Sequence, residues 1–395
     1  MGKPNGACAI CRISTWSGAA RMKLSRSRVA HGEASKFRPP SLDASRSFAL
    51  LFGAPECRED AEAIAAALGI KTCIGCSTSG EIFGGELTDR TVVVATVELE
   101  HGRARAHSLP IHGPDASRAA GQTLADALVE DDLVALFILS DGLLVNGSEL
   151  ASGLSSRVPP HVVVTGGLAG DGPRFKSTWV LADGAAVSGR VAAVALYGSR
   201  LDVRYGSRGG WDIFGPDRVV TRAEGNVVFE LDGKPVLDLY ESYLGERAAA
   251  LPASGLLFPL SIHPPEDPQR KVVRTLLGVD TVRRSLTFAG DVPVGWRARL
   301  MCANFDRLVQ GAADAALACD KADADRPTLV LAVSCVGRRL VLGERSEEET
   351  EATCDFFGPA ASQVGFYSYG ELSPLADGTC GLHNQTMTLT TIAER

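Results

Sequence analysis

The sequence predicts an α/β fold of two domains, with parallel or mixed sheets flanked by helices and a second half that is more antiparallel (α+β-like). Two observations support this prediction. Residues 47–75 read as strand, helix and strand, an order that normally builds a parallel sheet. Residues 271–301 instead alternate polar and apolar positions around glycine and aspartate turns, which is typical of antiparallel strands.

The composition is that of a soluble globular protein long enough for two cores. The 395 residues are 45% hydrophobic and 22% charged. The net charge of −7 and the lack of a basic stripe argue against nucleic acid as the main partner. No apolar run approaches the roughly 20 residues that a membrane span requires. With the scattered cysteines and the lack of a secretory signal described below, we expect a cytoplasmic protein.

We divide the chain into an extension (1–45), a first domain (46–236) and a second domain (237–395). Basic residues far outnumber acidic ones in the extension, and it lacks the apolar segment of a secretory signal. It faintly resembles an organelle transit peptide. A disordered tail, or a true start at Met22, is the interpretation that we favour.

The elements of the first domain follow from apolar periodicity and turn residues. In chain order they are a strand at 47–52, a helix at 58–68, strands at 70–75, 91–99 and 103–109, a helix at 115–129, a strand at 132–139, a helix at 148–156, a strand at 161–165, and a hairpin of 178–181 and 190–197. Asn146 or Ser148 caps the helix at 148–156.

Two segments, 218–230 and 235–245, carry the chain from the first domain into the second, which contains antiparallel strands and ends in another strand-helix-strand unit. The predicted elements of the second domain are strands at 271–279, 281–288 and 296–301, a helix at 302–321, a strand at 328–333, a helix at 347–356 and a strand at 363–365. Strand, helix, strand and a loop with glycine and an acidic residue thus occur three times. Ancient duplication and independent reuse of a common unit both explain this.

Two of these loops share a pattern that predicts a ligand site. Segment 75–81 reads GCSTSGE and segment 365–371 reads GFYSYGE, each followed by an aliphatic residue. Glu81 and Glu371 could each bind an ammonium group, with hydroxyl groups beside them. We interpret the two loops as edges of one site for a small polar molecule, although a lone glutamate is more often a surface or capping residue.

The third loop, GGLAGDG at 166–172, could bring backbone N–H groups close to an anion such as phosphate. No Gly-Lys-Ser/Thr follows it, and it does not open a helix as a dinucleotide fingerprint does. A structural turn is the alternative. We favour ligand contact because comparable loops end three predicted strands, where open α/β sheets bind ligands.

The candidate ligand-binding residues come from these loops, from the strand end at 140–141, and from polar residues near the C-terminus. They are Ser77, Thr78, Ser79, Gly80, Glu81, Ser140, Asp141, Gly166, Gly167, Gly170, Asp171, Ser334, Arg338, Tyr367, Tyr369, Gly370, Glu371, His383 and Asn384.

The ten cysteines are scattered, which favours reduced, buried thiols in a cytosolic protein. Cys8 and Cys11, like Cys73 and Cys76, have metal-like spacing, but nothing fixes four ligands together, so we predict no metal site and no catalytic residue. Cys76 with His383 is the one pair that an enzyme could use. Haem ligation by one of the seven histidines is a further alternative to a protein without cofactor.

Several motifs together resemble the FIST family. Those that resemble its N-terminal domain and junction are GCSTSGE at 75–81, SDG at 140–142, GGLAGDG at 166–172, LDGKP at 231–235 and YxxYLG at 240–245. Those that resemble its C-terminal domain are SCVGR at 334–338, GFYSYGE at 365–371 and HNQT at 383–386. The resemblance covers nearly everything from residue 47 onward.

The resemblance implies an intracellular sensory module of signal transduction that binds a small ligand such as an amino acid, and it also implies the alternative of a haem-based nitric oxide sensor. The family's output usually comes from a fused or neighbouring kinase, chemoreceptor or cyclic-dinucleotide enzyme. No kinase or cyclase motif remains here, so we expect signalling in trans to such a partner protein. An uncharacterised enzyme with Cys76 as nucleophile is the other alternative.

Overall fold

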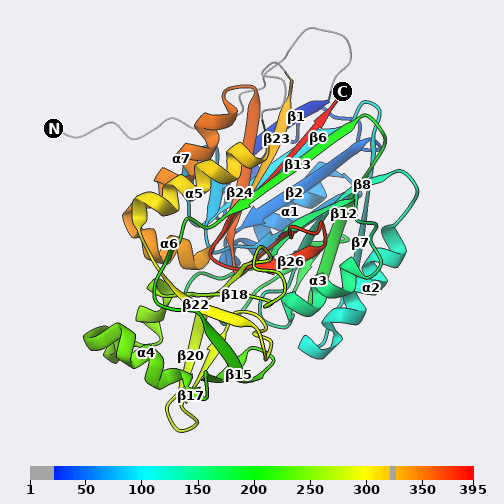
Figure 1. The fold of residues 1–395 in the computed structure, drawn as a ribbon. Helices are drawn as coiled ribbons and strands as arrows, with labels where there is room; N and C mark the ends of the chain where they lie inside the picture. The colour runs from blue at the N-terminus through cyan, green and yellow to red at the C-terminus, as the bar shows by residue number, and fades with distance from the viewer. Residues whose placement is uncertain (1–21, 321–325) are drawn as a thin grey trace, which may run out of the picture.

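The computed structural model describes residues 22–320 and 326–395. They form four sheets with helices packed on them (Figure 1). Three six-stranded sheets, which we call sheets I, II and III, combine parallel and antiparallel pairs, whereas a nine-stranded sheet is antiparallel throughout. The predicted α/β class, with a more antiparallel second half, is therefore confirmed. No helix in the described ranges is long and apolar enough to span a membrane.

Each six-stranded sheet combines strands from distant parts of the chain, and from one edge to the other their order is as follows. Sheet I contains β1 Lys23–Ala30, β6 Thr91–Glu98, β2 Ser47–Gly53, β3 Thr72–Ser77, β10 Val180–Ala182 and β11 Ala185–Val187. Sheet II contains β7 Arg103–Pro110, β12 Arg190–Tyr197, β8 Leu133–Ser140, β9 Val163–Leu168, β25 Gly370–Pro374 and β26 Cys380–His383. Sheet III contains β13 Leu201–Arg208, β27 Met387–Glu394, β23 Thr328–Cys335, β24 Ala361–Ser368, β4 Glu81–Phe83 and β5 Glu86–Thr88.

The three sheets share one strand order, so they are structural repeats. In each sheet, a parallel pair from a β-α-β unit is followed on one side by two antiparallel strands. On the other side lies a hairpin that belongs to a different repeat: β4–β5 joins sheet III, β10–β11 joins sheet I and β25–β26 joins sheet II. Because even this exchange recurs three times, the structure favours duplication over independent reuse.

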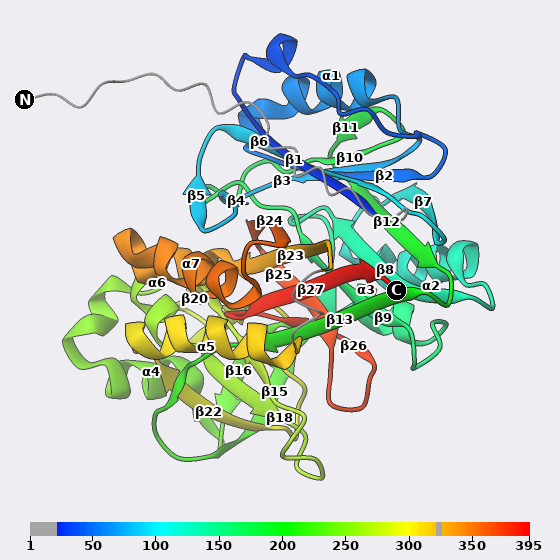
Figure 2. The same cartoon turned by 90° about the horizontal axis from the view of Figure 1, so that it is seen from above.

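Helices cover the outer faces of the sheets (Figure 2). They are α1 Arg58–Leu68 on sheet I, α2 Ser117–Leu128 and α3 Gly147–Ser155 on sheet II, and α5 Phe305–Ala318 and α7 Ser346–Phe357 on sheet III, with α6 Val336–Leu342 directly after β23. Asn146 caps α3, because its Oδ1 accepts hydrogen bonds from the backbone N–H groups of Ser148 and Glu149 at 3.0 and 3.1 Å.

The inner faces of sheets I, II and III pack against one another around three phenylalanines. Phe52, Phe137 and Phe366 come from sheets I, II and III in turn, and each is at most 3% exposed. The ring centroids of Phe52 and Phe366 lie 4.8 Å apart, and those of Phe52 and Phe137 lie 6.4 Å apart. Aromatic contacts at these distances add to the free energy gained by burial. The central core is therefore shared by all three repeats.

An insert module, residues 209–304, separates β13 from α5 and holds the nine-stranded sheet (Figure 1). Its elements are β14 Asp212–Ile213, β15 Arg218–Glu224, β16 Val227–Leu231, β17 Lys234–Pro235, α4 Val236–Leu244, β18 Leu260–His263, β19 Val272–Arg274, β20 Leu276–Asp280, β21 Ser285–Phe288 and β22 Arg297–Cys302. The boundary predicted near residue 236 falls inside this module. In space, the described residues form a threefold core and this one insertion, and the division near residue 236 stays a prediction.

Strand β1 corrects the prediction that residues 1–45 are a disordered extension. All eight of its residues pair with β6, although its pattern of serine and arginine is polar. Its basic side chains have partners on two sheets: Lys23 Nζ lies 2.8 Å from Glu98 Oε1 of sheet I, and Arg28 Nη1 lies 2.6 Å from Glu86 Oε2 of sheet III. A polar edge strand lacks the apolar signal on which the prediction relied. Residues 1–21 lie outside the described part.

Two further predictions differ in detail. Strand β10 forms its hairpin with β11 around Asp183 and Gly184, whereas β12 belongs to sheet II, so the predicted pairing of 178–181 with 190–197 is wrong. The short β11, with the sequence AAV, was too small to be recognised. Helix α5 also begins three residues later than predicted, because Asn304 caps it by accepting a hydrogen bond from Arg307 N.

Equivalent glycines allow the parallel strands to approach closely. A Cβ on Gly75, Gly166 or Gly365 would lie 2.5, 1.9 or 1.8 Å from the carbonyl oxygen of the neighbouring strand's Leu51, Ile138 or Ala332. Such distances are far shorter than any van der Waals contact, so only glycine fits without a backbone shift. The glycine that begins each predicted loop motif therefore has a packing reason.

We predict that Gly365→Ala lowers the free energy of unfolding by about 1–3 kcal/mol, the usual cost of overpacking a core. Chemical denaturation monitored by circular dichroism measures this change. Gly278→Ala in β20 is the matched control, because the nearest atom to its added Cβ, Thr287 Cβ, lies 3.6 Å away. Equal stability of the two variants would contradict the close-packing argument.

Candidate functional site

The three predicted loops meet at one end of the central core. Each follows the second strand of a β-α-β unit, namely β3, β9 or β24. Ser79 N donates a hydrogen bond to Tyr367 O at 2.8 Å, and Gly170 N donates one to Ser77 O at 3.0 Å. The loops that the sequence analysis grouped together are therefore neighbours in space.

Glu81 is fully buried, and its own loop satisfies its carboxylate. Thr78 Oγ1 donates to Glu81 Oε1, while Thr91 donates to Oε2 from its backbone N at 3.2 Å and its hydroxyl at 2.9 Å. Burial raises the pKa of Glu81 to about 7, even though these hydrogen bonds lower it. The Glu81 side chain therefore connects Thr78 to Thr91 by hydrogen bonds and stabilises the loop.

Glu371 repeats this arrangement in the third loop. Ser368 Oγ donates to Glu371 Oε1 at 2.6 Å, while Thr386 donates to Oε2 from its backbone N at 3.3 Å and its hydroxyl at 2.9 Å. Burial raises the pKa of Glu371 to about 8, against the same kind of hydrogen bonds. Strand pairing puts Val180 at the equivalent position of the second repeat, so only two repeats carry the carboxylate.

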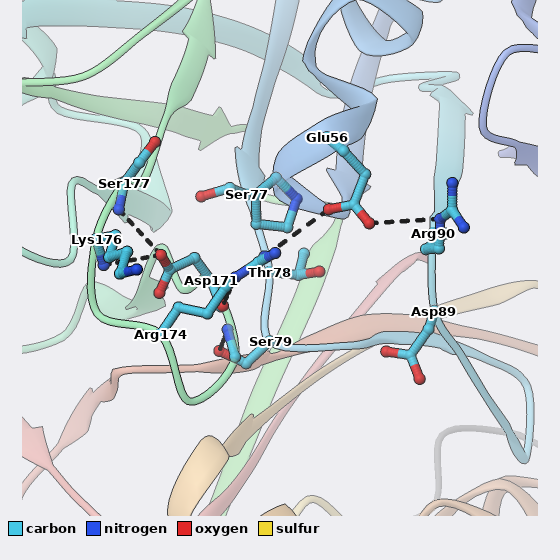
Figure 3. A network of polar contacts seen from close by, with 12 residues as sticks. Glu56, Ser77, Thr78, Ser79, Asp89, Arg90, Asp171, Arg174, Lys176 and Ser177 are labelled. Carbon is cyan, nitrogen blue, oxygen red and sulfur yellow. Dashed lines mark hydrogen bonds and ion pairs between the residues drawn. The ribbon is translucent and has the colours of Figure 1, made fainter.

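Asp171 organises the second loop, as Figure 3 shows. Its Oδ1 accepts a hydrogen bond from Phe175 N at 2.8 Å, and its Oδ2 accepts from Lys176 N and Ser177 N, both at 2.9 Å. The hydroxyl of Tyr369 also donates to Asp171, which ties the second loop to the third. Burial alone would raise the pKa of Asp171, but these hydrogen bonds hold it below its ordinary value.

The serine hydroxyls of the first loop accept hydrogen bonds from the second loop and from the residues that follow it. Ser77 Oγ accepts a hydrogen bond from Trp179 N, and Ser79 Oγ accepts one from Gly172 N, both at 3.0 Å. At the surface, Glu56 lies between two arginines (Figure 3). Its Oε2 lies 3.8 Å from Arg174 Nη2, and its Oε1 lies 3.5 Å from Arg90 Nε. Ion pairs this exposed contribute little to stability.

Asp141 and Ser140 also hold local structure. Asp141 Oδ1 accepts hydrogen bonds from Leu143 N and Leu144 N at 2.8 Å, and its Oδ2 accepts one from Gly189 N at 2.9 Å. The hydroxyl of Ser140 donates to the backbone oxygen of Asp141 at 3.2 Å. Both residues are buried, so these contacts fix the loop after β8.

Arg338 forms a buried ion pair with Glu349, a residue that the sequence analysis missed. Arg338 Nη2 lies 2.6 Å from Glu349 Oε2, and both side chains are completely buried. Ser334 and Tyr367 donate to Glu349 Oε1, each at 2.8 Å. Arg338 also donates to backbone oxygens, including Leu308 O at 2.8 Å. An acidic helical segment predicts solvent-exposed glutamates, so the burial of Glu349 could not be recognised from the sequence.

A cavity of about 350 Å³ lies between these loops and the insert module. Its core wall includes Phe175, Tyr369 and residues 335–337, and its opposite wall includes residues 250–253, Leu256 and residues 275–277. The rings of Phe175 and Tyr369 stack, with centroids 4.4 Å apart. The lining is mostly apolar. This volume and this lining are typical of small-molecule sites, which makes the cavity the candidate functional site.

Polar atoms without partners lie in and beside the cavity. Thr275 lines the cavity, and its buried hydroxyl has no hydrogen-bond partner among the described residues. The fully buried side-chain amides of Asn384 and Gln385, which do not line the cavity, also have no partner there. A Cβ on Gly337, a lining residue, would lie 2.5 Å from Gln385 Nε2. Buried polar atoms are usually satisfied, so these groups could bind an occupant or ordered water.

Of the predicted site residues, Tyr369 lines this cavity, and Ser334 and Arg338 flank the lining residues 335–337. Glu81 and Glu371 do not line it. Ligand contact through the carboxylates remains a prediction, whereas their contacts within the loops are evident. Apart from Tyr369, no lining residue was predicted, because the lining combines distant apolar segments of the chain; residues 335–337 lie within the SCVGR motif but between its predicted site residues.

His383 lies in a different, larger groove of about 810 Å³, lined also by residues 203–209 and 269–273. Its Nε2 lies 3.2 Å from Ser373 O. Burial lowers the pKa of His383 to about 4, so the imidazole is neutral near pH 7. The sequence analysis grouped His383 with Asn384, but only His383 lines the groove.

Cys76 lies in the central core, completely buried beside Phe52 of the neighbouring strand. Burial raises the pKa of its thiol well above the ordinary value, which disfavours the thiolate that a nucleophile needs. Cys73 packs in a different hydrophobic cluster, because it points to the opposite face of sheet I. Cys73 and Cys76 therefore do not converge on one ion, and Cys8 and Cys11 lie outside the described residues.

We predict that stability falls as pH rises from about pH 5 to pH 8, because the folded protein holds the protons of Glu81 and Glu371 more tightly than the unfolded chain does. Their contribution is full below pH 4 and disappears as pH rises through about 7 to 8. Each of the two groups changes the free energy of unfolding by at most about 1.4 kcal/mol per pH unit.

Urea denaturation across this range measures the slope. Glu81→Gln and Glu371→Gln should each flatten it, and Glu266→Gln, at an exposed position, is the control. Slopes unchanged from the native protein in both variants would refute the assignment.

In a comparison with solved structures, the chain matches an enzyme among others. A cyanuric acid hydrolase from A. caulinodans aligns at 14% identity over 74% of this chain and 99% of the hydrolase, with a TM-score of 0.17. A TM-score that low says nothing about the activity of this chain. No curated protein matches the sequence.

Family models match nearly the whole described chain. The FIST N domain model matches residues 47–234, and the FIST C domain model matches residues 237–374. These matches agree with the resemblance found in the loop motifs. The chain therefore belongs to the FIST family of sensory domains in signal-transduction proteins.

Proposed function

We propose that this chain is a cytoplasmic sensor that binds a small molecule in the 350 Å³ cavity and signals in trans to a partner protein. One observation carries the proposal: the cavity is bounded by the threefold core on one side and by the insert module on the other. An occupant would contact both. Its binding free energy would then depend on how the two parts sit together, which is what a sensor requires.

The lining narrows the class of ligand. The sequence analysis predicted a small polar molecule such as an amino acid. Among the described residues, those that line the cavity include no charged side chain, and leucine, valine, alanine and aromatic groups dominate. We therefore favour a metabolite with an aromatic or branched aliphatic body and a hydrogen-bonding group that faces Thr275. An amino acid with such a side chain belongs to this class.

The eight cysteines of the described ranges are free thiols, and six of them are buried. Free thiols are usual in the reducing cytoplasm, which supports the proposed location.

Haem is the second candidate ligand, and the cavity residues do not fit it well. The lining, as far as the structure describes it, has no histidine, and the Tyr369 hydroxyl already donates to Asp171 and Gly172 O. Burial raises the pKa of the Cys335 thiol well above its ordinary value, so a thiolate ligand is disfavoured. His383 lines the larger groove and His112 lines a further groove of about 480 Å³, so these are histidines that a haem hypothesis could use. A Soret band in protein purified with haem, lost in His383→Ala, would support that alternative.

We predict that a thermal-shift screen of amino acids, aromatic acids and nucleotides identifies a stabilising ligand, because a ligand at 100 times its Kd adds about 2.7 kcal/mol of stability. Thr275→Val should then weaken its binding about 2- to 10-fold, the effect of one neutral hydrogen bond. Ala253→Phe should weaken binding further by narrowing the cavity from an exposed lining position.

Thr281→Val, on an exposed residue of the insert module, is the matched control, and calorimetry measures the affinities. Equal affinity of all three variants would place the ligand elsewhere.

We also predict that ligand changes the affinity of this chain for a partner, such as a kinase or a cyclic-dinucleotide enzyme. The family models occupy residues 47–374, and we recognise no kinase or cyclase motif in the sequence. Pull-down of native partners with and without ligand, followed by titration, measures the coupling. Linkage requires partner and ligand to shift each other's affinity by the same factor. Turnover of the ligand by purified protein, without any coupled partner, would favour an enzyme instead.

A further inference from the structure

Three metal-ligating side chains of different chemistry meet on sheet I, away from the cavity. His31 directly follows β1, Cys57 ends the 3-10 helix η2 Pro55–Cys57, and Asp60 lies in the first turn of α1. A ligand atom of each residue lies within 4.8 Å of the corresponding atoms of the other two. The sequence analysis missed this cluster, because its members have no motif spacing and His31 lay in the predicted extension.

The cluster is accessible from one side. Cys57 is completely buried and Asp60 is 8% exposed, whereas the His31 side chain is 39% exposed. A buried thiol and a nearly buried carboxylate below an accessible imidazole leave one open coordination position, which water could fill. Ions could enter by the same route.

The hydrogen bonds of the cluster leave ligand atoms unused. His31 Nδ1 lies 2.9 Å from Asp60 Oδ2, which also accepts a hydrogen bond from Gly32 N at 2.9 Å. No hydrogen bond within the described ranges involves Cys57 Sγ, Asp60 Oδ1 or His31 Nε2. The backbone N of His31 donates to Arg90 O at 2.9 Å, which holds the histidine over α1. The loop is therefore already positioned before an ion binds.

We propose that His31, Cys57 and Asp60 form a zinc site with water as the fourth ligand. Zn²⁺ accepts imidazole nitrogen, thiolate sulfur and carboxylate oxygen in one tetrahedral site, a mixture that Mg²⁺ and Ca²⁺ do not favour. As the Zn–S bond forms, the S–H bond of Cys57 breaks and its proton passes to solvent. No electron transfer is involved.

Local charge supports a cation here. Burial is the main cause that raises the pKa of the Cys57 thiol, to about 12; the carboxylates of Glu81, Asp60 and Glu56 raise it further, and Arg90 lowers it. Glu56 pairs with Arg90 and Arg174, so the negative charge within the cluster itself comes from Asp60. A divalent cation would reduce this charge and is favoured by it.

Cobalt titration tests the site, because Co²⁺ commonly replaces Zn²⁺ and reports a thiolate ligand by a charge-transfer band in the near ultraviolet. The full chain carries Cys8→Ser and Cys11→Ser, so that this pair cannot bind the ion. After treatment with a chelator, Co²⁺ should produce the band and visible d–d bands, and Zn²⁺ should abolish both. Cys57→Ala should remove the charge-transfer band, and His31→Gln and Asp60→Asn should weaken binding at least about tenfold.

Cys73→Ala is the matched control, since Cys73 is another buried thiol of sheet I outside the cluster, and it should bind like the parent. Circular dichroism checks folding. If Cys57→Ala does not fold, His31→Gln decides the question, because this half-exposed side chain can change without disturbing the core. Absence of the band in the parent, a band that survives Cys57→Ala, or full affinity in His31→Gln would overturn the proposal and leave a purely structural pair of His31 and Asp60.

Discussion

The close packing of three sheets around Phe52, Phe137 and Phe366 is the constraint on which the rest of the structure depends. The strands can approach because Gly75, Gly166 and Gly365 have no side chain to place against the neighbouring backbone. Because these strands end together, the loops that follow them must also meet. Their carboxylates then become buried and need local hydroxyl donors, which Thr78, Thr91, Ser368 and Thr386 provide.

This packing explains which parts of the fold could be predicted from the sequence. The β-α-β units around α1, α3 and α7 were recognised because apolar strands and amphipathic helices have clear periodicities. The polar strand β1 and the short hairpin strands were not, since strands that pair at a sheet edge need little apolar sequence. The threefold repetition was visible as a recurring order of elements. The exchange of hairpins between sheets was not, because pairing partners hundreds of residues apart leave no local signal.

The candidate site, too, could be predicted only in part from the sequence. Glycine, serine and glutamate motifs correctly marked where loops converge, but most of their polar groups hold the loops to one another. The cavity beside them is lined by ordinary apolar residues from both halves of the chain, among which Thr275 and Tyr369 carry hydroxyl groups. Such a lining has no signature in one sequence. The position of the insert module, which closes the cavity over the core, can be read only in three dimensions.

The exchanged hairpins also bear on how the chain folds during synthesis. Sheet III takes its last two strands, β4 and β5, from the first repeat, and β4 pairs with Val364, Gly365 and Phe366. A nascent chain therefore exposes an unpaired strand edge at residues 81–88 until almost the whole polypeptide has left the ribosome. Contacts so distant in sequence slow folding and prevent one repeat from maturing before the next. The ring of repeats closes late, and until then the early edges are open to aggregation or to chaperones.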